Sequence, residues 1–263
     1  AYCRPSVHEG DFTRRIGRCV SDDFVHWSDP VEVLVPDEQD PPGLQFYAMQ
    51  VFKYEDLYIG QLLAYQTRPE EPHIRFYGTV DVQLAVSRDG IKWERIGNRQ
   101  PFIPNGPPGS LDSGEVYVAN APVKVNDELW FYYSPCSVEH GLTGRSGPIC
   151  LAKLRLDGFV SIDAGQEWGA LITKPFQCVG GSLRINAFAR GGAVQVAVLD
   201  EQGIQYDGFS KIDCAVFDSD AVCHKMTWRD NVFSTLKGKM IRLKFYLRNA
   251  QLYSFKQEQT RES

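Results

Sequence analysis

Three acidic segments contain the residues that could carry chemistry in this chain. Asp112 and Glu115 lie in LDSGEVYV, directly after the rigid loop GPPGS; Asp40 lies in PDEQDPPG, and Asp81 precedes VQLAV. Two carboxyl groups that face one another can act as general acid and general base on a substrate between them. A pair about 5 to 5.5 Å apart, or about 6.5 to 9.5 Å apart, is the arrangement that cleaves glycosidic bonds. We therefore take Asp112, Glu115 and Asp81 as candidate catalytic residues.

Aromatic and polar residues near these segments are candidates for contacts with a substrate. Aromatic rings can stack on the face of a sugar, and cationic or imidazole groups can hold its hydroxyl or acidic groups. The predicted substrate-binding residues are Asp40, Phe46, Tyr47, Arg75, Tyr117 and His140.

Each acidic candidate also has a purely structural interpretation. Asp112 can cap the turn at Ser113 and Gly114, and Glu115 can be a solvated strand residue. The acidic run around Asp40 can be a solvated loop, or a structural calcium site if several oxygens converge there. We expect no other metal or cofactor, because the sequence has no CxxC motif and no Cys/His cluster of the kind that binds zinc.

Composition narrows the class of protein. The chain has 263 residues, of which 43% are hydrophobic and 12% aromatic, enough for well-buried cores. The formal net charge is -5 and the 28 basic residues are scattered without runs, which argues against nucleic acid as a partner. No apolar stretch approaches the roughly 20 residues of a membrane helix, and the start AYCRPSVHEG does not have the form of a signal peptide. We expect a globular protein that binds neither nucleic acid nor membrane.

Strand signals dominate the chain. Segments such as LYIGQLLAYQT, VDVQLAVS and LWFYYSPC are short, rich in Val, Ile, Tyr and Phe, and separated by Gly, Pro, Asn and Asp. No long segment shows the 3.6-residue period of a capped amphipathic helix. The sequence therefore predicts an all-β fold.

Two phrases occur twice in the first half of the chain. VSDDFVHWSDP at 20–30 returns as VSRDGIKWERI at 86–96, and QVFKYEDLYIG at 50–60 returns as PVKVNDELWFY at 122–132. The first phrase predicts a turn in which Asp bonds its own backbone and Trp covers the sheet below. The second phrase predicts a hairpin with an acidic turn. The residues to which we give these structural roles are Asp23, Trp27, Asp89 and Trp93.

In chain order these phrases define a repeated four-strand unit. Residues 47–103 hold one unit, residues 116 to about 172 hold another, and residues 1 to about 36 hold the last three strands of a third. Repeated four-stranded antiparallel sheets of this length are the blades of a β-propeller. About two and a half blades cannot close a ring. We therefore expect a missing N-terminal segment or another chain to complete it.

The pattern changes after KPFQCVGG. Residues 176–256 read as roughly eight short strands with turns at RGG, DEQG, YDG and LKGK, a composition that suits an antiparallel β-sandwich. The final segment, KMIRLKFYLRNAQLYSF, alternates as expected for a half-buried sheet. The predicted domains are propeller blades at 1–175 and a β-sandwich at 176–263.

Cysteine positions suggest disulfides. Cys3 and Cys19 are symmetric about Gly10 and Asp11, and two further cysteines are symmetric about GLTGRSG, so each pair would meet across a hairpin. Such pairs favour disulfides, an oxidising compartment and an extracellular location. The alternative is that buried free cysteines act as small hydrophobic residues. The predicted pairs are Cys3 with Cys19, Cys136 with Cys150, and Cys214 with Cys223, which leaves Cys178 unpaired.

The S-x-D-x-x-x-W phrase, the segment LDSGEVYVANAPV at 111–123 and the appended sandwich together resemble the five-bladed β-propeller glycoside hydrolases, the group of invertases, fructanases and arabinanases. DEQDPPGLQFY, LAKLRLDGFVS and LKGKMIRLKFYLRNAQLYSF resemble proteins related to the N-terminal domain of glycoside hydrolase family 32. The resemblance implies a propeller that is five-bladed when whole and a carbohydrate substrate. It also implies an Asp nucleophile at the start of the first blade and a Glu-Cys acid motif. Neither motif is present, and Ser113 stands where the family has Phe.

Two hypotheses follow. The first is a secreted glycoside hydrolase that uses paired carboxylates at the propeller mouth, with Asp112 and Glu115 contributing one essential group. The second is a non-catalytic extracellular carbohydrate-binding or scaffold protein on the same fold, favoured by the absent Glu-Cys motif and the extra cysteines. Side chains that converge with another carboxylate would support the enzyme, and side chains bound in turn hydrogen bonds would support the scaffold.

Overall fold

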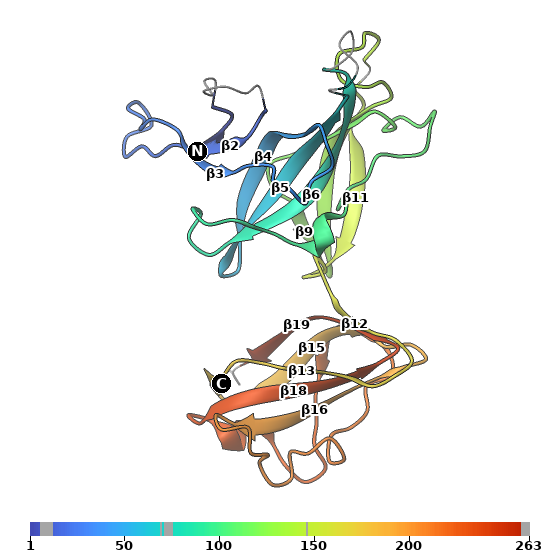
Figure 1. Ribbon diagram of the computed structural model, residues 1–263. Helices are drawn as coiled ribbons and strands as arrows, with labels where there is room; N and C mark the ends of the chain where they lie inside the picture. The colour runs from blue at the N-terminus through green and yellow to red at the C-terminus, as the bar shows by residue number, and fades with distance from the viewer. Residues whose placement is uncertain (6–12, 69, 71–75, 146, 259–263) are drawn as a thin grey trace. The chain divides into compact units, whose positions relative to one another are not determined.

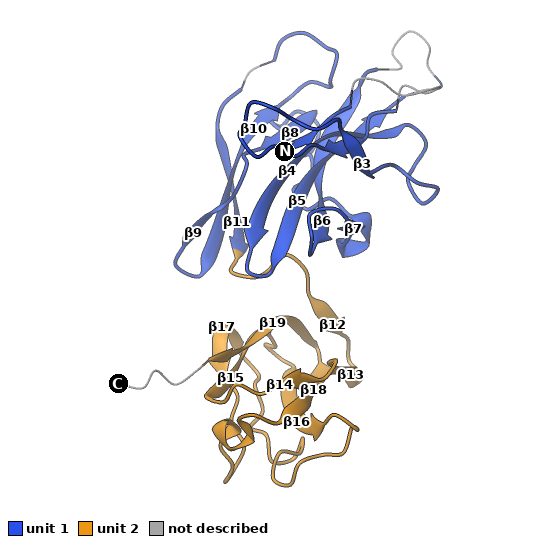
Figure 2. Ribbon diagram, turned by 90° about the vertical axis from the view of Figure 1, so that its left-hand side faces the viewer, with its two compact units in different colours: residues 1–154 blue, residues 155–263 orange. Residues whose placement is uncertain are grey.

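The structure, a computed structural model, describes residues 1–5, 13–68, 70, 76–145 and 147–258 (Figure 1). It divides into two compact units, Ala1–Leu154 and Arg155–Ser263 (Figure 2). The described residues form 19 strands and two short 3-10 helices, η1 (Gly97–Arg99) and η2 (Phe233–Leu236). The all-β class is therefore confirmed. Among the described residues, no helix has the length and apolar character to cross a membrane.

A small antiparallel sheet begins the first unit. Its strands are ordered β1-β2-β3, with Tyr2 opposite Arg18 and Ile16 opposite Leu34. This is the three-strand partial repeat that the sequence predicts. The strand bounds are β1 (Tyr2–Cys3), β2 (Ile16–Arg18) and β3 (Val31–Leu34).

An eight-stranded sheet forms the rest of the first unit and curls around its own face (Figure 1). Its main path is β11-β10-β8-β6-β5-β4, with β7 paired to β6 and β9 paired to β10. The antiparallel run from β4 to β7 is the four-strand unit predicted for residues 47–103. The bounds are β4 (Leu44–Tyr54), β5 (Leu57–Thr67), β6 (Gly78–Ser87), β7 (Glu94–Arg95), β8 (Glu115–Val118), β9 (Val123–Val125), β10 (Glu128–Cys136) and β11 (Cys150–Arg155).

The two repeats meet at strands β6 and β8. These strands are parallel and share one residue pair, Val80 with Glu115. The backbone N–H of Val80 donates to the carbonyl of Gly114 at 3.0 Å. This contact joins the repeats into one curled sheet and places the first residue of β8 beside the start of β6.

The second unit is a sandwich of two four-stranded sheets. One has the order β12-β19-β15-β17, and the other has β13-β18-β14 with β16 also paired to β18. Every second residue of β18, from Ile241 to Leu247, is buried, which confirms the predicted alternation. The core between the sheets includes Leu183 and Ile185 of one sheet with Leu243 and Phe245 of the other. Full burial of each such side chain stabilises the fold by about 1.5 to 3 kcal/mol.

The bounds of these strands are β12 (Ile162–Ala164), β13 (Gly169–Ile172), β14 (Phe176–Gln177), β15 (Ser182–Phe188), β16 (Ala193–Asp200), β17 (Asp220–Lys225), β18 (Met240–Arg248) and β19 (Ala250–Glu258).

The boundary between the units lies earlier than the predicted position after residue 175. Residues 155–175 belong to the second unit because β12 pairs with β19 and β13 pairs with β18. The segment FVSIDAG, expected as the fourth strand of the second repeat, is therefore a sandwich strand. The second repeat retains β8, β9, β10 and β11.

The predicted disulfides are not present as bonds, because all seven cysteines are free thiols. The sulfur atoms of Cys3 and Cys19 lie 3.5 Å apart, well beyond the bond length of about 2.05 Å. Cys3 pairs with Gly17 in the strand register, so Cys19 lies diagonally across from it. Cys214 is buried in the sandwich core, whereas Cys223 is exposed on β17. Cys136 is buried and Cys150 is half-buried, and no bond joins them, so this predicted pair is also wrong.

Candidate functional site

A row of side chains crosses five strands of the large sheet. The strand registers pair Gln45 with Tyr65, Tyr65 with Val80, Val80 with Glu115, and Glu115 with Cys136. Directly paired residues project from the same face of a sheet. Tyr117 lies two residues after Glu115 in β8, so it shares this face as well. Residues from distant parts of the sequence therefore meet on one surface.

A β-bulge adds Tyr47 to this surface. The β4–β5 register pairs Phe46 with Ala64 and Ala48 with Leu63, so Tyr47 is the extra residue between two regular pairs. A bulge bends the strand and changes the direction of a side chain. Phe46 is buried beneath the sheet, while the ring of Tyr47 lies 5.8 Å from that of Tyr65 and 5.9 Å from that of Tyr117.

Glu115 lies at the centre of this row of residues on the sheet face. Its side chain is completely buried by its neighbours. Its Oε1 accepts hydrogen bonds from the Tyr117 hydroxyl at 2.7 Å and from Arg145 at 3.1 Å, and Nδ1 of His140 lies 2.8 Å away. The guanidinium of Arg145 also lies 3.1 Å from Oε2 as an ion pair. Oε2 nevertheless has no hydrogen bond of acceptable geometry from any described residue.

His140 reaches this carboxylate from the loop after β10. Its backbone N–H donates to the carbonyl of Gly78 at 2.8 Å, which fixes the loop to the start of β6. Its ring lies 5.0 Å from the rings of both Tyr47 and Tyr65. The next residue, Gly141, has φ +94°, and a Cβ there would lie 2.5 Å from the ring of Tyr77. A glycine is therefore required for the chain to turn next to His140.

We call these residues the Glu115 cluster: Tyr47, Tyr65, Glu115, Tyr117, His140 and Arg145. Burial raises the pKa of Tyr117 strongly, and the hydrogen bond to Glu115 raises it further. Its hydroxyl is therefore a permanent donor. The cluster thus combines one buried carboxylate, an imidazole, a guanidinium and three phenol rings, a set of groups suited to binding hydroxylated rings.

Asp112 does not face this cluster. Its carboxylate accepts hydrogen bonds from the Ser110 hydroxyl at 2.8 Å and from the Tyr133 hydroxyl at 3.0 Å. The hydrogen bond from Ser110 is the main cause of a lowered Asp112 pKa, although partial burial opposes it. This is the structural role, as a turn residue, that the sequence left open.

Asp81 lies on the opposite face of the sheet from Glu115. Successive strand residues alternate between faces, and Val80, not Asp81, is the partner of Glu115. Asp81 instead belongs to the row of Phe46 and Ala64. Burial raises its pKa to about 6, and its Oδ1 has no hydrogen-bond partner among the described residues. The sheet therefore separates these two carboxyl groups.

Asp40 belongs to an ion-pair network. Its carboxylate pairs with Arg95, and Arg99 lies 3.1 Å from the same oxygen. Arg99 also contacts Asp37 at 2.6 Å, and Arg95 lies 5.1 Å from the ring centre of Phe46. These carboxylates thus have guanidinium partners, and the described part of the chain contains no group of three or more potential metal-ligating side chains.

Of the nine predicted site residues, four lie in the Glu115 cluster: Tyr47, Glu115, Tyr117 and His140. Asp40, Phe46, Asp81 and Asp112 lie elsewhere, and Arg75 is outside the described residues. Sequence reasoning missed Tyr65 and Arg145. The alternation in β5 could have suggested Tyr65, but Arg145 is in the glycine-rich loop GLTGRSG, where no periodicity indicates a direction.

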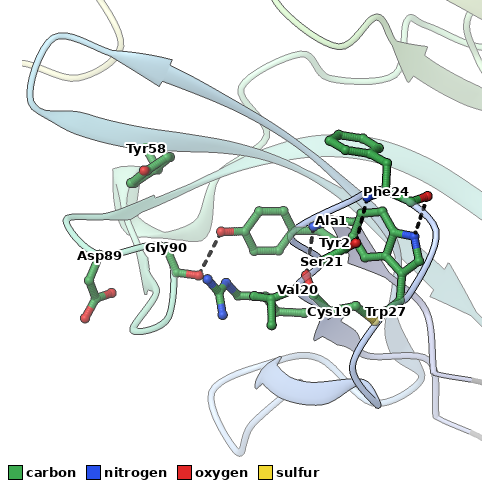
Figure 3. Close-up of a pocket in the computed structure, with 11 residues that line it drawn as sticks. Ala1, Tyr2, Cys19, Val20, Ser21, Phe24, Trp27, Tyr58, Asp89 and Gly90 are labelled. Carbon is green, nitrogen blue, oxygen red and sulfur yellow. Dashed lines mark hydrogen bonds between the residues drawn. The ribbon is translucent and has the colours of Figure 1, made fainter.

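A separate cavity of about 280 Å³ lies between the two repeated turns (Figure 3). It includes Ser21, Phe24 and Trp27 from the first phrase, and Asp89 and Gly90 from the second. None of the predicted catalytic or substrate-binding residues lines it.

No protein-family model and no curated protein matches the chain. Among solved structures, it is similar to a glycoside hydrolase at 18% identity and a TM-score of 0.39, covering 58% of this chain and 39% of that one. It is also similar to Bombyx mori GH32 beta-fructofuranosidase BmSUC1, at 10% identity and a TM-score of 0.31 over 93% of this chain and 61% of that one. A third structure is a glycoside hydrolase family 43 arabinoxylan arabinofuranohydrolase from Bacillus subtilis, at 9% identity and a TM-score of 0.28, covering 94% and 59%. The chain thus spans between 39% and 61% of the length of these structures.

Proposed function

We propose that this protein acts on carbohydrate through the Glu115 cluster, as a glycoside hydrolase in which Glu115 supplies one essential carboxylate. The observation that carries the proposal is the buried carboxylate of Glu115, whose Oε2 atom lies 3.1 Å from Arg145 as an ion pair but accepts no hydrogen bond from any described residue. A buried polar atom usually has a partner, and a sugar hydroxyl is a suitable one. The three tyrosine rings nearby provide apolar surfaces for the ring faces of a sugar.

The contacts of Glu115 suggest its role. Oε1 already accepts hydrogen bonds from Tyr117 and Arg145, so the group acts as a hydrogen-bond acceptor. We therefore assign it the part of the carboxylate, as base or nucleophile, rather than that of the proton donor. His140 and Tyr117 hold this carboxylate in position.

The test is hydrolysis of a panel of aryl glycosides and oligosaccharides by the full chain and by Glu115→Gln. We expect Glu115→Gln to lower the rate by about 100-fold or more, because an amide cannot act as base or nucleophile. Asp112→Asn is the matched control, since Asp112 lies in a turn, and its rate should stay within about threefold of the original. Equal rates for Glu115→Gln and the unchanged protein on every cleaved substrate would remove Glu115 from the mechanism.

A non-catalytic carbohydrate-binding protein is the second candidate. It is favoured by the positions of Asp112, Asp81 and Asp40, since none of these carboxylates joins Glu115. Isothermal titration calorimetry with the same oligosaccharides distinguishes the two functions. Binding that Glu115→Gln weakens, without hydrolysis of any substrate, would establish the binding protein and overturn the enzyme.

An extracellular location and the completion of the propeller also remain proposals. We propose that the protein is secreted, which fractionation of cells that express the native gene would test, because the protein should then collect in the medium. We also propose that a second chain completes the ring of blades. Sedimentation of the full-length protein would show whether a second chain is involved.

A further inference from the structure

The Glu115 cluster has two more cationic neighbours that sequence reasoning did not identify. The guanidinium carbon of Arg14 lies 5.1 Å from the ring centre of Tyr65 and 5.9 Å from that of Tyr47. That of Arg4 lies 5.4 Å from the ring centre of Tyr47. These two arginines come from the small N-terminal sheet region, whereas both tyrosines belong to the large sheet.

Neither arginine is neutralised by the described part of the chain. No carboxylate among the described residues forms an ion pair with Arg4 or Arg14, whose side chains contact tyrosine rings and, for Arg14, the amide of Gln45. Among the described residues, Arg4, Arg14 and Arg145 thus bring three guanidinium groups to the cluster, in which Glu115 is the one described carboxylate. The charge that the described residues place near the tyrosine rings is therefore positive.

Arg14 is also held in a defined orientation. Its NH1 group donates to Oε1 of Gln45 at 2.6 Å, and Gln45 is the end member of the row that contains Tyr65 and Glu115. The side chain is only partly exposed. One edge of the guanidinium is therefore used to fix its plane, and its other N–H groups remain for a ligand.

The electrostatic environment of Tyr65 supports this arrangement. Burial raises the pKa of Tyr65, the charge of Arg14 lowers it, and the charge of Glu115 raises it. The distance of 5.1 Å between the guanidinium carbon of Arg14 and the ring centre of Tyr65 places Arg14 at the site, and the directions of these pKa effects agree with it.

We propose that the ligand of the Glu115 cluster is an acidic glycan, whose carboxylate or sulfate group binds Arg14 and Arg4 while its sugar hydroxyls face Glu115. A planar guanidinium stacked on an aromatic ring keeps its N–H edge available, and this edge matches the two oxygens of an anionic group. A neutral sugar would offer these two guanidinium groups no anionic partner. This inference rests on the proposed function and names its substrate class.

The test compares three probes by isothermal titration calorimetry with the full chain. They are tetragalacturonate, its carboxyl-reduced neutral form, and a sulfated carrageenan tetrasaccharide. We expect at least one anionic probe to bind about tenfold or more tightly than the neutral form, and to weaken as salt rises. The two anionic arms distinguish a carboxylate ligand from a sulfate ligand.

Variants separate this site from general surface charge. Arg14→Ala and Arg4→Ala should each weaken binding of the anionic probe by about tenfold, and Arg14→Lys should lose most of this affinity because it lacks the planar fork. The matched control is Arg88→Ala, which removes an exposed arginine on the turn after β6 and should change affinity by less than twofold. Thermal unfolding of Arg14→Lys, which keeps the charge and much of the side-chain volume, confirms that the comparison concerns folded protein.

The outcomes distinguish the two proposals. Equal affinity for the neutral and anionic probes, with binding that depends on Glu115, would overturn the acidic ligand and leave the carbohydrate function intact. An equal loss in Arg88→Ala and Arg14→Ala would also overturn it. If no probe and no member of the substrate panel binds, both proposals fail.

Discussion

The two copies of the repeated phrase share the hydrogen bonds from Ser and Asp to the turn backbone but differ in their surroundings. In the first copy, the Ser21 hydroxyl accepts the backbone N–H of Phe24 at 2.8 Å, and Asp23 accepts those of Val25 and His26, both at 2.8 Å. In the second copy, Ser87 accepts the N–H of Gly90 at 2.9 Å, and Asp89 accepts those of Ile91 and Lys92, both at 2.8 Å. The turn is thus determined by its own residues.

The side chains around the two turns differ. Trp93 packs at the edge of a buried cluster, with the ring of Tyr2 at 5.5 Å in an edge-to-face contact. Trp27 is 42% exposed, and its neighbour Phe24 is 83% exposed. Both residues line the cavity (Figure 3). Among the described residues, the tryptophan of the second turn is packed against a buried cluster, whereas that of the first turn is exposed. Local sequence therefore specifies the shape of the turn, and the strands around it decide whether the tryptophan stabilises the fold.

The first prediction, which has the largest expected effect, tests the difference in packing between Trp93 and Trp27. We expect Trp93→Ala to lower the free energy of unfolding by about 3 kcal/mol, because it leaves a cavity beneath Tyr2. Trp27→Ala should cost less than about 1 kcal/mol, since Trp27 is 42% exposed and its ring packs on the exposed ring of Phe24. Urea unfolding of the full chain, followed by circular dichroism, measures both. Equal losses would show that the two tryptophans have equivalent packing.

The second prediction concerns the glycine of the second turn. Gly90 has φ +71°, and a Cβ there would lie 2.8 Å from the hydroxyl oxygen of Tyr2, whose hydroxyl donates to the Gly90 carbonyl at 2.7 Å. Gly90→Ala should therefore lower the free energy of unfolding by about 1 to 2 kcal/mol. Gly109→Ala is the control, because Gly109 also has positive φ, at +88°, but has no atom near its Cβ position. If Gly90→Ala and Gly109→Ala lower the free energy of unfolding equally, backbone strain alone explains the effect and the contact with Tyr2 contributes nothing.

The third prediction has the opposite sign. Phe24 occupies the position of Gly90 in the first turn and has φ +63°, a conformation that is strained for a residue with a side chain. Phe24→Gly should relieve this strain and raise the free energy of unfolding by up to about 1 kcal/mol. The loss of the ring costs little, because Phe24 is 83% exposed and packs on the exposed ring of Trp27. A clear destabilisation in the same urea experiment would show that the ring of Phe24 supports the cavity rim.

The distinction between local turn shape and packing by distant strands also explains how much of the structure the sequence predicts. Strand periodicity and the repeated phrases predict the β4 to β7 unit and the turns, because both depend on residues close in the chain. The register between strands that are distant in the sequence cannot be predicted in this way. A shift of one residue decides whether Asp81 or Val80 shares a face with Glu115, and nothing local to either strand specifies it.

The candidate site shows the same limit. Glu115, Tyr117 and His140 could be identified from their types and their positions near an acidic segment. The bulge that turns Tyr47 toward them depends on pairing with β5, and Arg145 approaches Glu115 across a sequence separation of 30 residues. Arg14 approaches from the segment just before β2, outside the large sheet. These contacts arise from packing and could not be predicted from local sequence patterns.

The last prediction, which has the smallest expected effect, compares the pKa values of Asp23 and Asp89 in the two turns. Hydrogen bonds lower the pKa of both turn carboxylates: the backbone N–H of His26 is the main cause for Asp23, and that of Lys92 for Asp89. Because both folded-state pKa values are lowered, each carboxylate contributes stability above its unfolded pKa of about 3.9, and this contribution is lost as the pH falls through the folded pKa. The surroundings of the two carboxylates differ in the His26 ring, since Nδ1 of His26 lies 2.7 Å from Asp23. His26→Ala should therefore raise the pKa of Asp23 and leave that of Asp89 unchanged, as NMR titration of the carboxyl carbons would show. An unchanged Asp23 pKa would mean that backbone donors alone hold both carboxylates, and the two turns would then be electrostatically equivalent despite their different packing.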